Sequence, residues 1–197
     1  MKLESGRLCL DFANTVEWHL SDHPAESLTS YGALIAWARS IDLLSDRVVQ
    51  RLLQAADQHP AEAARVLERA IAVRDAIYQI LVTVARGQTP PAADQAVLNT
   101  ELSRSLAKSH LIWNETAFDW QRQGEDGDPD QILWWVVRST IDLLTGDDLE
   151  RVGVCADDRG CGWLFYDTSR NRTRQWCSMR GCGNRAKARR HYEKVKS

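Results

Sequence analysis

Apolar residues recur at helical spacing through much of the first 90 positions of the chain. One such segment covers residues 31–41 and a second covers residues 48–53, with Ser45 placed to cap the second. A third begins at Pro60, which suits the first turn of a helix, and Gly87 marks its end. The stripe expected on this third segment is Ala64, Leu67, Ile71, Tyr78, Leu81 and Ala85. Three successive helices are therefore predicted.

The pattern then changes after a clear break at Thr89, Pro90 and Pro91. A further helix is expected at residues 92–108. Aromatic and aliphatic residues on both sides of an Asn-Glu pair predict a short β-hairpin within residues 111–121. A turn at residues 126–129 leads into a last apolar helix at residues 132–144. The first 150 residues are long enough to bury a core of their own.

Four polar residues of this helical part are candidates for a small-ligand pocket. Asp11, Asn14 and Thr15 have the spacing that places side chains on one face of a helix. Arg138 interrupts the apolar helix at residues 132–144 and could supply the partner charge. The same residues also suit a buried polar cluster that ties two helices together, because buried polar groups need hydrogen-bond partners. Both interpretations stay open on the sequence alone.

The net charge of −2 conceals a division of the chain into an acidic and a basic part. Residues 1–150 hold 13 Lys and Arg against 23 Asp and Glu, a net charge of −10, whereas residues 151–197 hold 12 against 4, a net charge of +8. Such asymmetry favours a nucleic acid or a membrane as partner of the basic part. We therefore expect two domains, residues 1–150 and residues 151–197.

The cysteines are divided in the same way as the charge, because four of the five lie in the basic part. These four are Cys155, Cys161, Cys177 and Cys182, separated by 5, 15 and 4 residues. Two close pairs joined by a spacer suit a tetrahedral Zn²⁺ site, and a site filled by four protein ligands is structural rather than catalytic. The remaining Cys9 lies in an apolar stretch and is expected to be a small buried hydrophobe. The sequence thus predicts one structural zinc ion.

A basic helix is expected directly after the last cysteine, at residues 183–195. A narrow apolar stripe of Ala188, Tyr192 and Val195 would seat this helix on the finger. Cations cover the rest of its surface, and the polar loop at residues 167–174 adds further arginines, so contacts to double-stranded DNA are expected. The candidate contacts are Arg174, Arg180, Asn184, Arg185, Lys187, Arg189 and Arg190.

Signatures of other protein classes are absent from the sequence. It holds no Gly-rich phosphate loop, no H-E-x-x-H motif and no G-x-S-x-G elbow, so an enzyme is not expected. An enzyme in the helical part would have only the set of Asp11, Asn14, Thr15 and Arg138 to support it. No apolar run approaches the ~18 residues of a membrane helix. The first residues are too polar for a signal peptide, which favours the cytoplasm and no membrane partner.

The C-terminal motifs resemble a known family, the CGNR zinc fingers. The resemblance rests on residues 161–169 (CGWLFYDTS), 174–179 (RQWCSM) and 182–185 (CGNR). Residues 10–15 (LDFANT) are similar to the start of the ABATE domain that usually precedes this finger. The resemblance implies a bacterial, stress-induced transcription regulator that carries zinc on the four matched cysteines. The first cysteine pair departs from the family pattern by having five intervening residues where four are usual.

Taken together, these patterns predict a mainly α protein. A helical N-terminal domain with a short β-hairpin precedes a small α+β four-cysteine zinc finger, treble-clef-like or zinc-ribbon-like, that ends in a basic helix. The expected function is zinc-dependent DNA binding by a transcription regulator, with the helical domain sensing a small-molecule effector or forming a homodimer that reads two half-sites. The alternative is a zinc-stabilised protein-interaction module, whose basic tail docks on an acidic partner without direct DNA binding.

Overall fold

Six helices form the body of the molecule. The structure is a computed structural model that describes residues 1–124 and 127–196, apart from the side chains of residues 194 and 195. The helices of the body are α1 (Leu8–Ala13), α2 (Tyr31–Ser40), α3 (Asp46–Gln58), α4 (Pro60–Ala85), α5 (Ala92–Ala107) and α6 (Gln131–Thr145). The short strands β1 (Val16–Glu17) and β2 (Ala25–Glu26) pair between α1 and α2. The helices predicted from apolar spacing are thereby confirmed.

Local capping explains several of the helix boundaries. Ser45 accepts a hydrogen bond from the backbone amide of Val48 and so caps α3 as predicted, and Ser30 caps α2 in the same way. Pro60 occupies the first turn of α4, where its missing N–H costs nothing. The predicted turn at residues 126–129 begins outside the residues that the structure describes.

Helix α4 runs through the centre of the body, and its buried face differs from the predicted stripe. Ala64 and Ala85 are exposed, whereas Ala63, Val66 and Ala70 face the core. The C-terminal half is buried over a wider arc because α4 contacts α1, α2 and α5 as well as the strands that follow α6. The other four predicted residues, Leu67, Ile71, Tyr78 and Leu81, do contact the core, but a single stripe is typical of a surface helix and was too narrow for a helix with neighbours on several sides.

Helix α1 lies inside the same core and packs against α4 and α6. Leu8, Leu10 and Phe12 are buried, as is Cys9, whose burial raises its pKa to about 11. A thiol in this state is a poor nucleophile, which agrees with the interpretation of Cys9 as a small hydrophobe.

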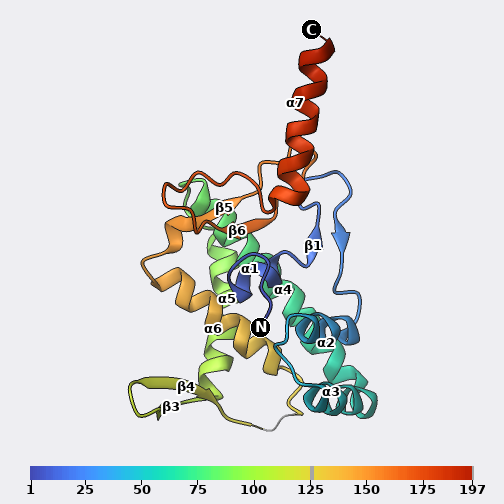
Figure 1. Cartoon of the computed structure of the whole chain (residues 1–197). Coiled ribbons are helices and arrows are strands. Elements are labelled where there is room, and N and C mark those ends of the chain that lie inside the picture. Colours follow the sequence, from blue (N-terminus) through green and yellow to red (C-terminus); the bar gives the residue numbers. More distant parts are fainter. Residues whose placement is uncertain (125–126, 197) are drawn as a thin grey trace.

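The predicted hairpin forms between α5 and α6. Strands β3 (Ser109–Trp113) and β4 (Phe118–Arg122) pair in antiparallel register, with Leu111 opposite Trp120 and Trp113 opposite Phe118. The hairpin extends sideways from the end of the body that lies away from the C-terminus (Figure 1).

The C-terminal part consists of a small hairpin, a loop and a helix. Strands β5 (Val152–Val154) and β6 (Leu164–Tyr166) pair in antiparallel register, and a π-helical turn at Met179–Gly183 leads directly into α7 (Asn184–Lys196). The hairpin is not separate from the helical body, since Val152 and Leu164 are buried in its hydrophobic core. No helix in the described ranges is long and apolar enough to cross a membrane.

Helix α7 projects from the body as a free arm (Figure 1). The expected apolar stripe does not seat it, because Ala188 is exposed and the Tyr192 side chain lies in solvent with 68% of its surface accessible. The third stripe position, Val195, lies outside the described side chains. Arg185 in the first turn and Arg189 and Arg190 in the second contact the finger, so these cations, and not the predicted apolar stripe, hold α7 on it.

Candidate metal centre and nucleic-acid interface

The four clustered cysteines meet at one point. Cys155 follows β5, Cys161 lies in the loop before β6, Cys177 precedes the π-helical turn and Cys182 lies within it. Their sulfur atoms lie within 4.8 Å of one another, with 3.7 Å from Cys161 to Cys177 and 3.6 Å from Cys177 to Cys182. Sulfurs ~2.3 Å from a tetrahedral zinc ion are about 3.8 Å apart, so the geometry fits Zn²⁺.

The chemistry of the four sulfurs also fits a divalent cation. Hydrogen bonds from the Cys161 and Cys177 thiols lower the pKa of Cys155, and the backbone amides of Cys177 and Asp157 act in the same direction. Hydrogen bonds with Cys155 and Cys161 raise the pKa of Cys177, and burial and repulsion by the negative charge of those two neighbours act in the same direction. A bound Zn²⁺ removes this repulsion and holds all four as thiolates, which leaves the site with a formal charge of −2. The four cysteines therefore form a site for one zinc ion.

The position of the second cysteine pair decides between the two finger types that the sequence left open. Cys177 and Cys182 flank the start of the helical segment, whereas Cys155 and Cys161 lie in the loop between two strands. Ser178 caps this segment by accepting a hydrogen bond from the amide of Gly181. A loop pair followed by a pair at a helix start is the treble-clef-like arrangement.

Arg185 joins the zinc site to a buried carboxylate. Its Nη2 donates to the Cys182 sulfur at 2.9 Å and to the Asp157 carboxylate at 2.7 Å, and its Nε donates to the same carboxylate oxygen at 3.1 Å. Burial alone would raise the pKa of Asp157, but hydrogen bonds with Arg185, the Arg159 amide and Cys182, together with the Arg185 charge, outweigh it and lower that pKa. The same hydrogen bonds raise the pKa of Arg185. Arg185 thus offsets the negative charge of the thiolates.

A tryptophan from the helical domain holds this arginine from the other side. The guanidinium groups of Arg185 and Arg159 each lie 5.3 Å from the Trp18 ring centre, and Arg159 also pairs with Asp157. Trp18 packs against the cysteine cluster. Its backbone adopts a positive φ of 58°, a strained conformation for a bulky residue that persists where the surroundings over-determine it. The helical domain therefore contributes directly to the surroundings of the metal.

The backbone around the cysteines is also tied to the loop that follows β1. His19 and Leu20 donate amide hydrogen bonds to the carbonyl oxygens of Cys161 and Gly160. A Cβ at Gly160 would lie 2.6 Å from the backbone nitrogen of Ser21, and the glycine has a positive φ of 88°. Glycine is required there because two backbone segments come into contact, a reason that is not visible from the cysteine spacing alone.

Replacing Arg185 by alanine is expected to weaken zinc binding by 10- to 100-fold, the range found for partners of metal ligands. The thiolate charge would lose its cation, and Asp157 would remain buried beside the thiolates. Competition with a zinc chelator measures the change. Arg180→Ala is the matched control, because Arg180 is exposed and lies in the π-helical turn directly before α7. Equal zinc affinities of the two variants would contradict this role of Arg185.

Arg174, predicted to contact DNA, instead braces the finger from within. Its Nε donates to the carbonyl of Trp176 at 2.9 Å, its Nη1 to the carbonyl of Tyr166 at 3.1 Å, and its Nη2 to the carbonyl of Cys177. Its guanidinium carbon lies 4.6 Å from the Phe165 ring centre. Because three of its donors are used on backbone carbonyls, Arg174 holds the finger together, and its contact with DNA stays a prediction. Arg185 is committed to the metal site in a similar way.

The other predicted contacts lie on the exposed surface of the turn and of α7. Arg189 forms ion pairs with Asp158 and Glu193, and Arg190 lies 5.8 Å from the Trp176 ring centre. Ion pairs at the surface contribute little, so these cations can exchange partners readily. The exposed set is Arg180, Asn184, Lys187, Arg189 and Arg190.

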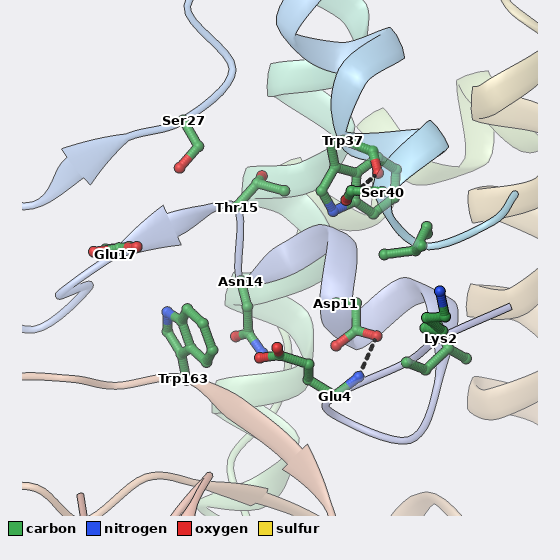
Figure 2. A pocket seen from close by; sticks show the side chains of 12 residues that line it. Lys2, Glu4, Asp11, Asn14, Thr15, Glu17, Ser27, Trp37, Ser40 and Trp163 are labelled. Atoms are coloured by element: carbon green, nitrogen blue, oxygen red, sulfur yellow. Dashed lines mark hydrogen bonds between the residues drawn. The ribbon is translucent and has the colours of Figure 1, made fainter. Parts of the chain in front are cut away.

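The polar residues at the end of α1 lie together, but Arg138 is not among them. Asp11, Asn14 and Thr15 line a cavity of about 540 Å³ together with Trp37 of α2 and Trp163 of the finger (Figure 2). Arg138 instead pairs with Asp119 and donates to the carbonyl of Trp120, beside the β3–β4 hairpin. The prediction that Arg138 joins Asp11, Asn14 and Thr15 is therefore corrected, because Arg138 balances the charge of a carboxylate on β4.

All three remaining polar side chains make hydrogen bonds within the protein. Asp11 accepts the amides of Glu4 and Ser5, and partial burial raises its pKa. Thr15 donates to the carbonyl of Phe12. Asn14 donates to the carbonyl of Leu164 and accepts its amide, both at 2.8 Å. The sequence left open a small-ligand pocket and a buried polar cluster. The buried polar cluster accounts for these hydrogen bonds without a ligand.

Sequence reasoning missed Trp163 and Trp37 as residues of this cavity. Trp163 lies between Cys161 and β6 and donates its ring N–H to the carbonyl of Val16 at 3.0 Å. No local pattern connects it to residues near position 14, because their contact forms only when the finger packs on the helical body. The cavity wall therefore comes from both ends of the chain.

Two family models match the chain. The ABATE model, described as "Putative stress-induced transcription regulator", matches residues 6–147. The CGNR zinc-finger model matches residues 151–195. No curated protein matches the chain.

Proposed function

Because the chain belongs to the ABATE family and ends in a CGNR zinc finger, we propose that it is a zinc-dependent transcription regulator that binds double-stranded DNA through α7. The zinc ion fixes the start of α7 to the finger, and the exposed side of the helix can enter a groove. The observation that carries this proposal is the exposed cationic surface of a helix that projects from the body (Figure 1).

The dimensions and charge of α7 suit the DNA major groove. The helix has 13 residues, a length of about 20 Å, and it lies in the part of the chain with a net charge of +8. Lys187, Arg189 and Arg190 are exposed on it, and Arg180 and Asn184 lie at its start. These residues are the proposed contacts to phosphates and base edges.

The cavity at the end of α1 is the proposed place for a small-molecule effector. Its wall includes Trp163, two residues after the metal ligand Cys161, so a molecule bound there would contact the finger itself. An effector that binds one position of this wall more tightly than another would shift the finger toward that position. Under this proposal the helical domain senses, the finger reads DNA, and both act in the cytoplasm without an enzymatic step.

Replacing Lys187 and Arg190 together by alanine is expected to weaken binding to any duplex and to lower its salt dependence. Each phosphate contact contributes about −0.9 to the slope of log Kobs against log salt, so losing two makes the slope less negative by about 1.8. Fluorescence anisotropy with a labelled duplex at several salt concentrations measures it, using the zinc-loaded protein.

The matched control is Arg39→Ala with Arg65→Ala, which removes two exposed cations from the helical domain instead. Its slope should equal that of the unaltered protein. A zinc-loaded protein that binds no duplex at low salt would contradict the proposed function and favour the zinc-stabilised interaction module. Truncation after Lys187 also tests that alternative. The shortened protein keeps Arg185 at the metal site and loses the rest of α7.

A further inference from the structure

One face of the β3–β4 hairpin is apolar and lies in solvent. Leu111 and Trp113 on β3 stand opposite Trp120 and Phe118 on β4, so the four side chains share that face. Their exposed fractions are 55% for Leu111, 60% for Trp113, 41% for Trp120 and 69% for Phe118. The rings of Trp113 and Phe118 contact edge to face at 5.2 Å between centres. Such exposure of large apolar side chains is unusual unless they meet a partner.

The apolar face continues into a groove on the helical body. The groove has a volume of about 200 Å³ and lies where Trp120 meets α5 and α6, lined among others by Leu106, Val137 and Ile141. Leu106 is 48% exposed. We call the five residues Leu106, Leu111, Trp113, Phe118 and Trp120 the hairpin surface.

The base of the hairpin is held in a fixed place relative to this groove. Trp134 of α6 donates its ring N–H to the Ser109 hydroxyl at 2.7 Å, and Arg138 pairs with the Asp119 carboxylate at 2.6 Å. Arg138 also donates to the carbonyl of Trp120 at 3.0 Å. A preformed surface of this kind binds without the cost of ordering a mobile segment.

The exposed area of the hairpin surface matches what a dimer needs. An aromatic side chain presents about 150–250 Å², so the exposed fractions above leave roughly 500 Å² of apolar surface per molecule. Two copies face to face would bury roughly 1,000 Å² from these five residues alone, the lower bound for a specific interface. Trp and Phe are also enriched in interfaces, and Trp is enriched among the residues that dominate binding energy.

We propose that the hairpin surface is the interface of a two-fold symmetric homodimer of this chain. A two-fold axis places one patch against the same patch, which suits a surface whose five side chains carry no charge. The border of the hairpin surface carries both signs of charge, because Arg138 lies beside the carboxylates of Asp119 and Asp142. The border of one copy can therefore pair with the same border of the other copy. The hairpins of the two copies would then pack their aromatic faces over each other's grooves.

This interface leaves α7 free. The hairpin extends from the end of the body opposite α7, so α7 takes no part in the contact (Figure 1). A two-fold axis parallel to α7 directs both α7 helices to the same side, as two half-sites on one duplex require. This last consequence rests on the proposed function, whereas the dimer itself does not.

Sedimentation velocity of the zinc-loaded protein without DNA tests the proposal. The unaltered chain is expected to be a dimer at about 50 µM, and Phe118→Glu is expected to raise the dimer dissociation constant at least 100-fold, since each dimer contains the substituted position twice. Phe118→Ser, which adds no charge, should act in the same direction. Phe118 is exposed to solvent in the single chain, so replacing it should not disturb the fold. Circular dichroism of both variants should therefore match that of the unaltered chain.

Leu53→Glu is the matched control, because Leu53 is an exposed apolar residue of α3 and lies outside the hairpin surface. It should leave the dimer unchanged. A monomeric unaltered chain at 50 µM would overturn the proposal and leave the surface to another protein. A dimer that Phe118→Glu does not weaken would place the interface elsewhere and overturn it as well. The Lys187 and Arg190 double variant should remain a dimer, which separates this proposal from the proposed function.

Discussion

Replacing Cys182 by serine is expected to abolish stoichiometric zinc binding and, with it, binding to DNA. The substitution leaves three thiolates and removes the sulfur that receives the Arg185 hydrogen bond. A structural zinc ion contributes about 10–16 kcal/mol of apparent binding free energy in small fingers, so the loss of one ligand removes a large share of the stability of the finger. Metal analysis after dialysis against a mild chelator, followed by anisotropy with a labelled duplex, measures both losses.

The helical body should survive this substitution. The cysteines pack with Trp18, Trp163 and Trp176 in a small cluster that is separate from the main hydrophobic core. Strands β5 and β6 contribute Val152 and Leu164 to the main core, so they should stay attached when the metal is lost. We therefore expect most of the helical circular dichroism signal to remain while the first turn of α7 detaches from the finger.

The matched control is Cys9→Ala, which removes the cysteine that lies far from the metal site in α1. This variant should keep one zinc ion per chain, although the cavity it creates in the core lowers the free energy of unfolding. Retention of stoichiometric zinc by Cys182→Ser would contradict the four-cysteine site. Equal zinc loss in both variants would instead point to a general unfolding of the protein.

The parts of the site that depend on local sequence could be predicted, and the zinc ligands are the clearest case. Two close cysteine pairs need only short loops to converge, so their spacing is sufficient evidence. The basic helix after Cys182 was also predictable from the local sequence. Its cations were harder to interpret, because a guanidinium that points to solvent and one that points inward have the same sequence pattern. Arg174 and Arg185 point inward because Asp157 and several backbone carbonyls surround them, which only the fold reveals.

Periodicity predicted where helices lie but not how many neighbours each of them has. For α4 it gave one stripe, whereas the helix is contacted on several sides and Tyr78 reaches across to donate to the carbonyl of Gly162 in the finger. For α7 it gave a stripe that would pack, although the Tyr192 side chain is 68% exposed. A stripe of three apolar residues does not hold a helix along its length on a domain as small as this finger. Long-range packing decides both cases.

Replacing Asn14 by alanine is expected to lower the free energy of unfolding by about 3–4 kcal/mol. Asn14 is buried at the end of α1, and its amide pairs with both the N–H and the carbonyl of Leu164, as a neighbouring strand would. Its nitrogen also donates to the Ser5 hydroxyl at 2.8 Å. Each buried backbone group left without a partner costs about 1–3 kcal/mol. Urea unfolding of the zinc-saturated protein measures the change.

Two further variants separate a structural role of Asn14 from a role in ligand binding. Asn14→Asp keeps an acceptor for the Leu164 amide but removes the donor to its carbonyl and buries a charge, so it should destabilise the protein to a similar degree. Thr15→Val is the matched control, because Thr15 is buried beside Asn14 and its hydroxyl makes only a local bond to Phe12, worth about 1 kcal/mol. If Asn14→Ala costs no more than Thr15→Val, the amide does not join α1 to β6, and its place in the cavity wall would then favour contact with an effector.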